Sequence, residues 1–499
     1  MWRMRQPVAV IAFETPHAPG GGIAAVLGQQ PGIFGTVFGA RIPIVTPRHR
    51  YIKKMKALPE NEIQTIGTVT IPFSTDQFQV AVQFYERTNT YFLDLVDSRL
   101  DPPAFSGFPT PYKMQAASSG NGNANATLLR DALLFGTAIP HALKIIEPVA
   151  SSWTLLLQDW EAATVALASA EHVFLLTLHN SYDSGAVSDG VLVAHGIDPL
   201  MCPGPSSSNA GSVLERAIPN CRMPILTVSE QFAADLVTDL FQTHIMADHL
   251  QNFFSTHGLK GIDNGPFAAI PRDLLDIVET CDKGAVQVWK TKQRTLAVAA
   301  LHEFSPTPEN PVWGDRNQFD FASPVWFIMA GRDDARQKGY DVAVSAIRSY
   351  LSKDGDAQFL FYPILGDEGL AGISFLEELA TEYRERVLVF PGFFPGFEAV
   401  LRGATFGLMP SLYEPFGMAN EYYLKGVPVV ARATGGIIQQ VVPLRGCSSF
   451  STAVQKQIKH YYSHASEPSG ILFRESDDIP SAMQIGCGLT QPLTLLRSD

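Results

Sequence analysis

The sequence predicts an α/β protein of two lobes, each built on a parallel β-sheet covered by helices. In both halves of the chain, short apolar runs that suit buried strands alternate with helical patterns, which is typical of parallel sheets. The chain has 499 residues, 46% of them hydrophobic, and is too long for one compact core. We expect a first domain over 1–305, a proline-rich linker over 306–324 and a second domain over 325–499.

The expected strands follow one another in chain order. Two arginines precede the first apolar run, as in a signal peptide, but the run is too short for that role and leads into a glycine-rich turn. We therefore interpret it as the first buried strand, at 7–13. The other strands of the first half are expected at 42–47, 82–86, 173–179 and 225–229. Those of the second half are expected at 325–331, 357–363, 386–392, 405–410 and 428–433, with a helix over 340–351.

Composition argues against several classes of protein. The net charge is −12 and the main basic block is confined to 53–56, which argues against a dedicated binder of nucleic acid or anionic membranes. The five cysteines are scattered without a C-x-x-C pair, so we expect neither a disulfide framework nor a cysteine-based zinc site, and a reducing, cytoplasmic compartment fits best. No segment reaches ~18 uninterrupted apolar residues, so we expect no membrane span.

Signatures of other enzyme classes are missing from the sequence. There is no G-x-x-x-x-G-K-[ST], G-x-S-x-G or G-x-G-x-x-G motif, so assignment as a kinase, a hydrolase or a dehydrogenase has little support. His244 and Asp248 would share a helix face, but His249 points elsewhere and no third spaced ligand follows, so we expect no metal site. The irregular stretch at 101–127 is interpreted as a surface loop or as a lid.

The most informative segment spans 410–437. Glu414 follows a proline-bounded apolar strand, and Thr434, Gly435 and Gly436 then form a turn before a helix. A glycine-rich turn at the start of a helix offers unpaired amides and the positive end of the helix dipole, which suits a diphosphate. The alternative is a strand, a turn and a helix that only pack.

Further polar residues stand where expected strands end. Arg332 and Lys338 follow the strand at 325–331 and are candidates to neutralise a diphosphate, with a solvated loop of local ion pairs as the alternative. His179 opens a polar cluster and Asp159 follows another apolar run, although a buried structural histidine would also fit. Ligands of open α/β sheets bind at the carboxyl ends of the strands, so we expect these side chains to lie near a binding site.

Taken together and in order, these segments resemble the starch and glycogen synthase family, which are retaining glycosyltransferases of the GT-B fold. The resemblance covers most of the chain and implies two Rossmann-like domains facing across a cleft. It rests on seven segments in register, at 8–28, 155–163, 175–185, 227–236, 258–267, 329–341 and 411–430.

The resemblance implies a role for each matched residue. Arg332 and Lys338 would clamp the donor diphosphate, and Glu414 would hydrogen-bond the transferred hexose. His179 would lie beside the hexose and help to stabilise positive charge at the anomeric carbon, while Asp159 would line the sugar or acceptor side. The further donor-binding residues that it implies are Gly21, Gly22, Tyr422, Thr434, Gly435 and Gly436.

The chain also departs from the family pattern. Pro19 stands where the family has a lysine in the N-terminal glycine loop, Ala25 where it has an acidic residue and Lys260 where it usually has asparagine. The chain ends soon after 469–475, so the family's last helix is expected to be altered or absent. Tyr422 agrees with the family, since many related transferases have a second glutamate at this position and the synthases have tyrosine.

We therefore expect transfer of glucose from ADP-glucose or UDP-glucose to the non-reducing end of an α-1,4-glucan, with retention of configuration. The expected partners are the nucleotide sugar and the glucan, with no nucleic acid, no cofactor beyond the donor and no metal, because fixed cations would neutralise the diphosphate. The alternatives are a GT-B transferase acting on a small molecule or lipid, and a catalytically impaired homologue that binds glucan or nucleotide. We make no prediction of the oligomeric state.

Overall fold

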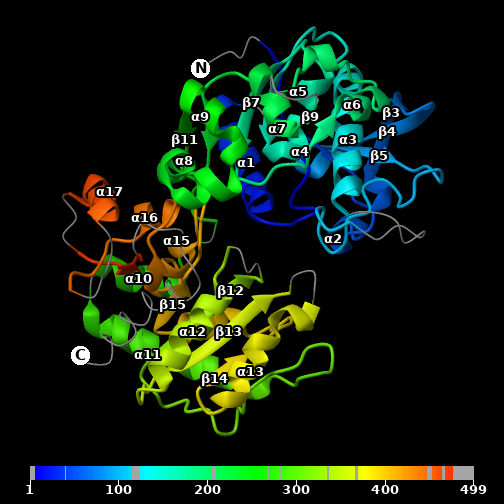
Figure 1. Cartoon of the computed structure of the whole chain (residues 1–499). Helices are drawn as coiled ribbons and strands as arrows, with labels where there is room; N and C mark the ends of the chain where they lie inside the picture. Colours follow the sequence, from blue (N-terminus) through cyan, green and yellow to red (C-terminus); the bar gives the residue numbers. More distant parts are fainter. Residues whose placement is uncertain are drawn as a thin grey trace. The chain divides into compact units, whose positions relative to one another are not determined.

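The chain forms two compact units, Met1–Asn264 and Gly265–Asp499. The computed structural model describes residues 6–39, 41–114, 124–204, 210–267, 269–280, 282–333, 337–365, 369–446, 452–463 and 467–475. Figure 1 draws the first unit in blue to green and the second in green to red. Each unit has its own sheet and its own hydrophobic core.

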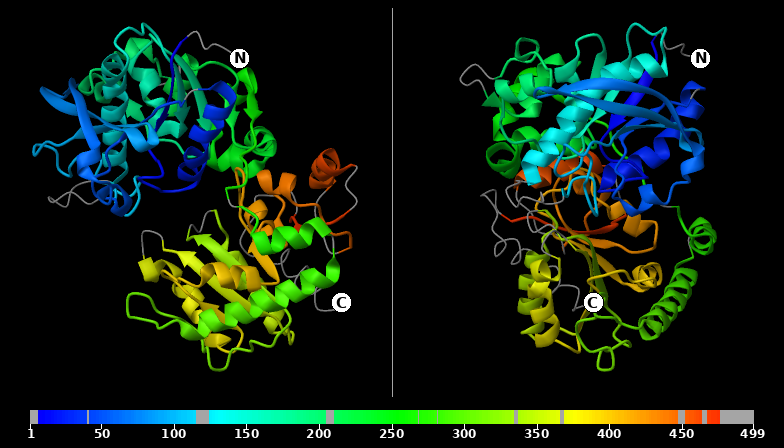
Figure 2. Two further views of the ribbon diagram at one scale, coloured as in Figure 1. Left: turned by 180° about the vertical axis from the view of Figure 1, so that it is seen from behind. Right: turned by 90° about the vertical axis from the view of Figure 1, so that its right-hand side faces the viewer.

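The first unit is built on a sheet whose described strands run in the order β11-β10-β7-β6-β1-β2-β5-β4-β3. The pairs from β11 to β5 are parallel, whereas β3 and β4 form an antiparallel hairpin at the edge of the sheet, blue in Figure 2. The strands are β1 (Val8–Ala12), β2 (Ile44–Pro47), β3 (Ile63–Phe73), β4 (Asp76–Tyr85), β5 (Thr90–Leu95), β6 (Thr154–Gln158), β7 (Val173–Leu178), β10 (Ile225–Thr227) and β11 (Leu259–Gly261), with a separate ribbon of β8 (Val187–Ser188) and β9 (Ala210–Gly211).

Helices cover both faces of this sheet, because successive residues of a strand point to opposite sides. In β1, Ala9 and Ile11 belong to the large core cluster that includes α3, while Val10 and Ala12 pack with α1. The helices are α1 (Gly22–Phe38), α2 (Lys53–Lys56), α3 (Ala124–Ile146), α4 (Asp159–Ala163), α5 (Val165–Ala168), α6 (Asp189–Ala194), α7 (Val213–Ala217), α8 (Glu230–Thr238) and α9 (Gln251–His257).

The second unit is built on a parallel sheet in the order β14-β13-β12-β15-β16-β17. The chain runs outward from β12 to β14 and then returns to the other side of β12 with β15. The strand order therefore reverses between β12 and β15, which is the usual ligand position in such sheets. The strands are β12 (Trp326–Arg332), β13 (Gln358–Ile364), β14 (Val387–Val389), β15 (Phe406–Met409), β16 (Val429–Arg432) and β17 (Gly470–Phe473).

Both faces of the second sheet are also covered. Ile328 belongs to the core cluster that includes residues of α11, α14 and α16, while its neighbours Phe327 and Met329 pack with α12 and α13. The helices are α10 (Arg272–Thr280), α11 (Lys283–Glu303), α12 (Tyr340–Leu351), α13 (Ser374–Glu382), α14 (Phe397–Gly403), α15 (Ala419–Tyr423), α16 (Gly436–Gln440) and α17 (Thr452–Tyr462).

The predicted α/β architecture is confirmed. Every strand expected from the sequence overlaps a strand of the structure, and the helix predicted over 340–351 is α12. Strands β3, β5, β11 and β17 were not among the predicted strands. In β3, most side chains are exposed or half-buried and leave no apolar run. Edge strands of this kind carry a weak sequence signal.

The division between the two units lies earlier than the predicted linker at 306–324. Helix α11 belongs to the second unit, where Ala297 and Leu301 are fully buried in its core. Within the proline-rich segment, Trp313 pairs with Val389 of β14 and Phe319 is buried. The proline-rich segment therefore packs on the second sheet.

Two further features bear on the sequence analysis. None of the helices in the described residues is both long enough and apolar enough to cross a lipid bilayer. Cys202 and Cys221 are buried free thiols. The other three cysteines, Cys281, Cys447 and Cys487, lie outside the described residues.

Candidate functional site

A pocket in the second unit lies at the point where the strand order reverses. Residues of β12 and β15 form its floor, and the segment after β15 forms one wall. Its lining is mostly apolar, with a few polar groups. The lining residues are Met329, Ala330, Lys338, Leu408, Met409, Ser411, Glu414, Met418 and Tyr422.

Glu414 and Lys338 meet in this pocket. The Nζ atom of Lys338 lies 2.5 Å from Oε1 of Glu414, and the hydroxyl of Ser411 donates to the same oxygen at 2.8 Å. The Glu414 side chain is 5% exposed, so its charge depends on these two donors. Two residues that the sequence analysis selected independently are thus brought together as an ion pair.

The start of α12 positions Lys338. A Cβ atom added to Gly339 would lie 2.4 Å from the carbonyl oxygen of Pro410, so only glycine allows this close approach to the Glu414 segment. The amide of Leu412 donates to the carbonyl of Gln337 at 2.8 Å and joins the same two segments. These backbone contacts hold the lysine beside the carboxylate.

Arg332 lies at the exposed end of β12. Its guanidinium donates to Oε1 of Gln337 at 3.4 Å, and it does not line the pocket with Lys338. Asp334 and Arg336, which belong to the same predicted phosphate-binding loop, lie outside the described residues. The structure therefore brings Lys338 to Glu414 and leaves Arg332 exposed, outside the lining of the pocket.

The turn at Thr434, Gly435 and Gly436 packs directly on the Glu414 segment. The amide of Gly436 donates to the carbonyl of Glu414 at 3.0 Å, and the hydroxyl of Thr434 is 3.4 Å from the carbonyl oxygen of Leu412. Gly435 has φ +47°, and a Cβ atom there would lie 1.7 Å from the backbone carbonyl oxygen of Glu414. Two of the donors expected to hold phosphate are therefore engaged within the protein, where they support Glu414.

Tyr422 also lines the pocket. It is 5% exposed, and burial raises the pKa of its hydroxyl to about 12, so the side chain is neutral. A Cβ atom on Gly407 of β15 would lie 2.5 Å from its ring. The small residue in the strand thus makes room for the tyrosine under the pocket.

Sequence reasoning missed a buried ion pair behind this site. Arg432, at the end of β16, contacts both carboxylate oxygens of Glu475 through Nε, at 2.9 and 3.0 Å, and its Nη1 donates to the carbonyl of Leu412. Both side chains are almost fully buried. A charged residue at the end of an otherwise apolar strand was the available signal, since burial of a charge demands a partner.

In the first unit, Asp159 and His179 meet at the carboxyl ends of the neighbouring strands β6 and β7. Oδ1 of Asp159 accepts the amide N–H of His179 at 2.6 Å, and Oδ2 accepts the side-chain amide of Asn180 at 3.0 Å. The His179 ring is 2.7 Å from Oε1 of Gln158. Asp159 has φ +60°, a left-handed conformation that often marks functional turns.

Burial controls the charge of this group. It lowers the pKa of His179 to about 4, so the imidazole is neutral at physiological pH. It raises the pKa of Asp159 to about 7, with Glu14 adding to the effect, and raises the pKa of the neighbouring Glu161 well above its usual range. Such perturbed groups concentrate at functional sites.

The glycine loop of the first unit binds a carboxylate of the chain itself. Oε1 of Glu14 accepts the amides of Gly21 at 2.5 Å and Ala24 at 3.0 Å, and Oε2 accepts the hydroxyl of Tyr112 at 2.9 Å. The amide of Gly21, expected to face donor phosphate, is thus already bonded at the start of α1. Gly22, the first residue of α1, is exposed.

Glu14 and Tyr112 were not selected from the sequence. The position of Glu14 directly after the first strand was the available signal, while Tyr112 comes from the stretch interpreted as a loop or lid, of which 115–123 lie outside the described residues. Among the described residues there is no group of three or more His, Cys, Asp or Glu side chains arranged to hold a metal ion.

Comparisons with known proteins show sequence similarity in the second unit. Residues 324–455 match the family model of group 1 glycosyl transferases. A probable glycogen synthase of Methanocaldococcus jannaschii is 34% identical over 110 residues, which are 22% of this chain and 20% of that protein. A glycogen synthase of Myxococcus xanthus is 36% identical over 109 residues, which are 21% of this chain and 22% of that protein. The match thus spans about a fifth of the length of these relatives.

A solved structure resembles the chain over nearly all its length. The catalytic domain of starch synthase IV from Arabidopsis thaliana, bound to ADP and acarbose, has a TM-score of 0.63 and 16% identity, and the alignment covers 99% of this chain and 92% of that domain. At this identity the likeness shows the fold, and it confirms the GT-B class predicted from the sequence.

Proposed function

We propose that the chain is a starch or glycogen synthase-like transferase, because residues 324–455 match group 1 glycosyl transferases and part of the chain is similar to glycogen synthases. In this proposal it transfers glucose from ADP-glucose or UDP-glucose to the non-reducing end of an α-1,4-glucan, with retention of configuration. The observation that carries this proposal is the Lys338–Glu414 pair in the pocket of the second unit. A cation that could bind phosphate and a carboxylate that could bind sugar hydroxyls lie there within hydrogen-bond distance of each other. The starch synthase of similar fold is bound to ADP and acarbose, which supports a nucleotide and a glucan as ligands.

The proposed chemistry requires the pair to separate when the donor binds. The diphosphate pairs with Lys338 and Arg332. Glu414 then accepts hydrogen bonds from hexose hydroxyls in place of the contact with Lys338. The bond between the anomeric carbon and the phosphate oxygen then breaks, and a bond to the acceptor oxygen forms on the same face. The proton of the acceptor hydroxyl goes to the departing diphosphate. The fixed cations stabilise the charge that develops on the leaving group, so the proposal needs no metal and no further cofactor.

In the first unit, we propose that Asp159 and His179 lie on the sugar and acceptor side of the reaction. A neutral imidazole at His179 does not repel positive charge that develops at an anomeric carbon. Asp159 holds the backbone of His179 in place through a hydrogen bond of 2.6 Å. We propose a cytoplasmic location, where nucleotide sugars are available.

The test is incubation with labelled ADP-glucose or UDP-glucose and either glycogen or small acceptors. Label in glycogen that is abolished by Glu414→Ala and retained in Lys425→Met supports the proposal, because Lys425 pairs with exposed Glu398 outside the pocket. Label in small or lipid acceptors alone would contradict the glucan assignment and favour a transferase of other specificity.

A catalytically impaired binding protein is the second candidate. The Glu14 carboxylate bonded to the glycine-loop amide of Gly21, together with Pro19 in place of a lysine, favours it, since both disfavour an anionic ligand at this loop. Calorimetry separates the candidates: binding of ADP or maltooligosaccharide without any turnover supports the impaired homologue, and turnover excludes it.

A further inference from the structure

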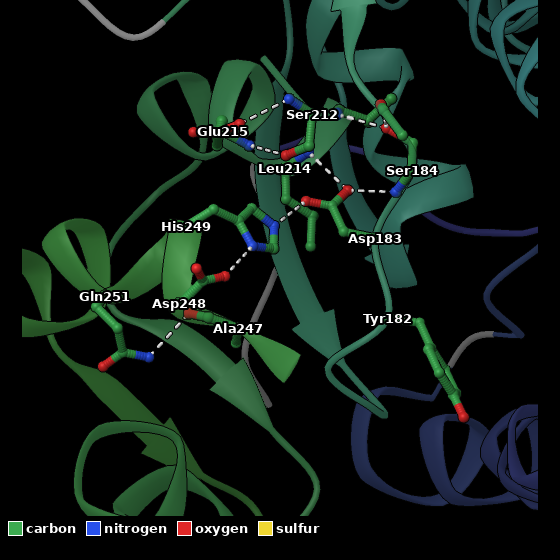
Figure 3. Close-up of polar contacts among 12 residues, drawn as sticks. Tyr182, Asp183, Ser184, Ser212, Leu214, Glu215, Ala247, Asp248, His249 and Gln251 are labelled. Carbon is green, nitrogen blue, oxygen red and sulfur yellow. Dashed lines mark hydrogen bonds and ion pairs between the residues drawn. The ribbon is translucent and has the colours of Figure 1, made fainter. Parts of the chain in front are cut away.

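A buried carboxylate, Asp183, ties together three segments of the first unit (Figure 3). Oδ1 of Asp183 accepts the amides of Ser184 at 2.7 Å and Leu214 at 3.2 Å. Oδ2 lies 2.9 Å from Nε2 of His249, which belongs to the short helix η6 (Asp248–Leu250). The carboxylate side chain is 4% exposed, so its charge must be compensated by these partners.

A second contact fastens the same loop to α7. The hydroxyl of Ser184 accepts the amide of Val213 at 2.8 Å and donates to the carbonyl of Gly185. The helix start is itself closed by a capping box, in which Ser212 and Glu215 exchange hydrogen bonds of 2.7 and 3.1 Å. The amides at the start of α7 are therefore used by Asp183, Ser184 and the box, and they hold the loop from one side.

The other end of the loop is held by Asp159. The loop begins at His179, whose amide donates to Asp159, and Asn180 binds both Asp159 and the amide of Tyr182. Residues 179–184 are thus fastened by one carboxylate at each end. The contact with His249 differs from the others, because its donor changes charge near neutral pH. At the other end of the loop it is the acceptor Asp159, with a pKa of about 7, that titrates in this range.

Several acidic groups face His249. Besides Asp183, Oδ1 of Asp248 lies 3.6 Å from Nδ1 of His249, and Glu215 of α7 acts on the ring through its charge. These carboxylates together raise the pKa of His249, in spite of its partial burial. A raised folded-state pKa means that the stabilisation is complete below the unfolded value of about 6.5 and is lost as the pH rises through the folded value.

We propose that His249 and Asp183 form a pH-sensitive positioning pair for the loop at 179–184. When His249 is protonated, a charge-assisted hydrogen bond closes the loop onto α7 and η6. When it is neutral, the bond to Asp183 is weaker, the buried carboxylate loses its compensating charge and the loop opens more often. The effect on the loop stands by itself, whereas an effect on transfer rests on the proposed function, through His179.

The test is hydrogen exchange followed by mass spectrometry of peptides covering 179–185, corrected for the intrinsic pH dependence of exchange. Between about pH 6 and about pH 9, opening of these peptides should rise about fivefold in the wild type. His249→Gln places a neutral amide nitrogen where Nε2 lies, so the hydrogen bond remains but the pH dependence of opening should fall to the part that Asp159 contributes. His249→Ala removes the bond and should open the loop at every pH.

A matched control is His257→Gln. This histidine belongs to α9 of the same unit, and its ring contacts the carbonyl of Phe253 in its own helix. It should behave like the wild type. Two results would overturn the proposal. One is a wild-type loop whose opening is independent of pH, and the other is a His249→Gln variant with the wild-type pH dependence. Asp183→Asn, which keeps the oxygen acceptor but not the charge, should also reduce the pH dependence.

Activity adds a second readout. If the protein transfers glucose, kcat of the wild type should fall with rising pH in proportion to the closed fraction of the loop. KM should change less, and His249→Gln should flatten the profile. Identical kcat profiles of wild type and His249→Gln would overturn the positioning role. Exchange results as expected in a protein without transferase activity would leave the pair established and defeat the proposed function.

Discussion

Lys338 and Glu414 are 76 positions apart in the chain, yet Nζ and Oε1 lie 2.5 Å from each other in one pocket. The contact exists because Gly339 touches the carbonyl of Pro410 and because the turn at Gly435 supports the backbone of Glu414 from behind. Each charge therefore has the other as its partner. This state sets the first prediction.

Separate substitutions of the two partners should have opposite effects on nucleotide binding. Lys338→Met should weaken ADP binding about tenfold, because a phosphate contact is lost. Glu414→Gln should keep or improve ADP binding, since Lys338 is no longer engaged by a carboxylate. Both should lower transfer about 10²- to 10³-fold. Calorimetry and labelled-donor assays measure the two effects, with Lys425→Met as the control; weaker ADP binding in Glu414→Gln would contradict this account.

Removal of one partner of the Arg432–Glu475 pair should be strongly destabilising. Arg432→Met leaves the buried carboxylate of Glu475 with only the longer contact to Arg474, at 3.6 Å, and should cost about 3 kcal/mol of unfolding free energy, measured with urea. Arg432→Met combined with Glu475→Met should recover part of this loss, though the bond to the carbonyl of Leu412 stays missing.

The exposed pair of Arg348 and Glu382 is the comparison for this experiment. Its atoms are also close, at 2.8 Å, but both side chains are about half exposed. Arg348→Met should cost less than about 1 kcal/mol. Equal losses at the two sites would show that the buried pair has no special importance.

Gly435→Ala should disrupt the Glu414 segment. The new methyl group would lie 1.7 Å from the carbonyl oxygen of Glu414, on a residue with φ +47°. We expect a loss above about 2 kcal/mol and a large fall in transfer. Gly446 also has a positive φ but open space around it, so Gly446→Ala should cost only about 1 kcal/mol. The difference between the two variants isolates the steric contact.

The buried acid Glu161 should make stability depend on pH. Burial and the charge of Asp159 raise the pKa of Glu161 well above its usual range, so its contribution is present at low pH and is lost as the pH rises. Glu161→Gln mimics the protonated form and should stabilise the protein relative to wild type by an amount on the order of 1 kcal/mol at pH 8, and by less at pH 5. Urea midpoints measure this, with exposed Glu171→Gln expected to show no such trend.

Much of the fold could be predicted because buried parallel strands are short, apolar and bounded by turn residues. This signal is local, and it placed β1, β7 and β12 within one or two residues of their observed limits. The hairpin strand β3 escaped because one of its faces is exposed, and the unit boundary was placed too late because α11 packs on the second sheet. Packing partners of a helix are not encoded in its own periodicity.

The sequence by itself determined the class of fold and the residues that follow strand ends, including Asp159, His179, Lys338 and Glu414. Within each sheet, parallel strands place their carboxyl ends at one edge, so the residues that follow the strands of that sheet gather there. Only the tertiary structure decided which charges meet. It joined Lys338 to Glu414, Arg432 to Glu475, Glu14 to the glycine loop and Asp183 to His249. A sequence contains many cations and amides that could pair with a given carboxylate, and long-range packing determines which of them comes close to it.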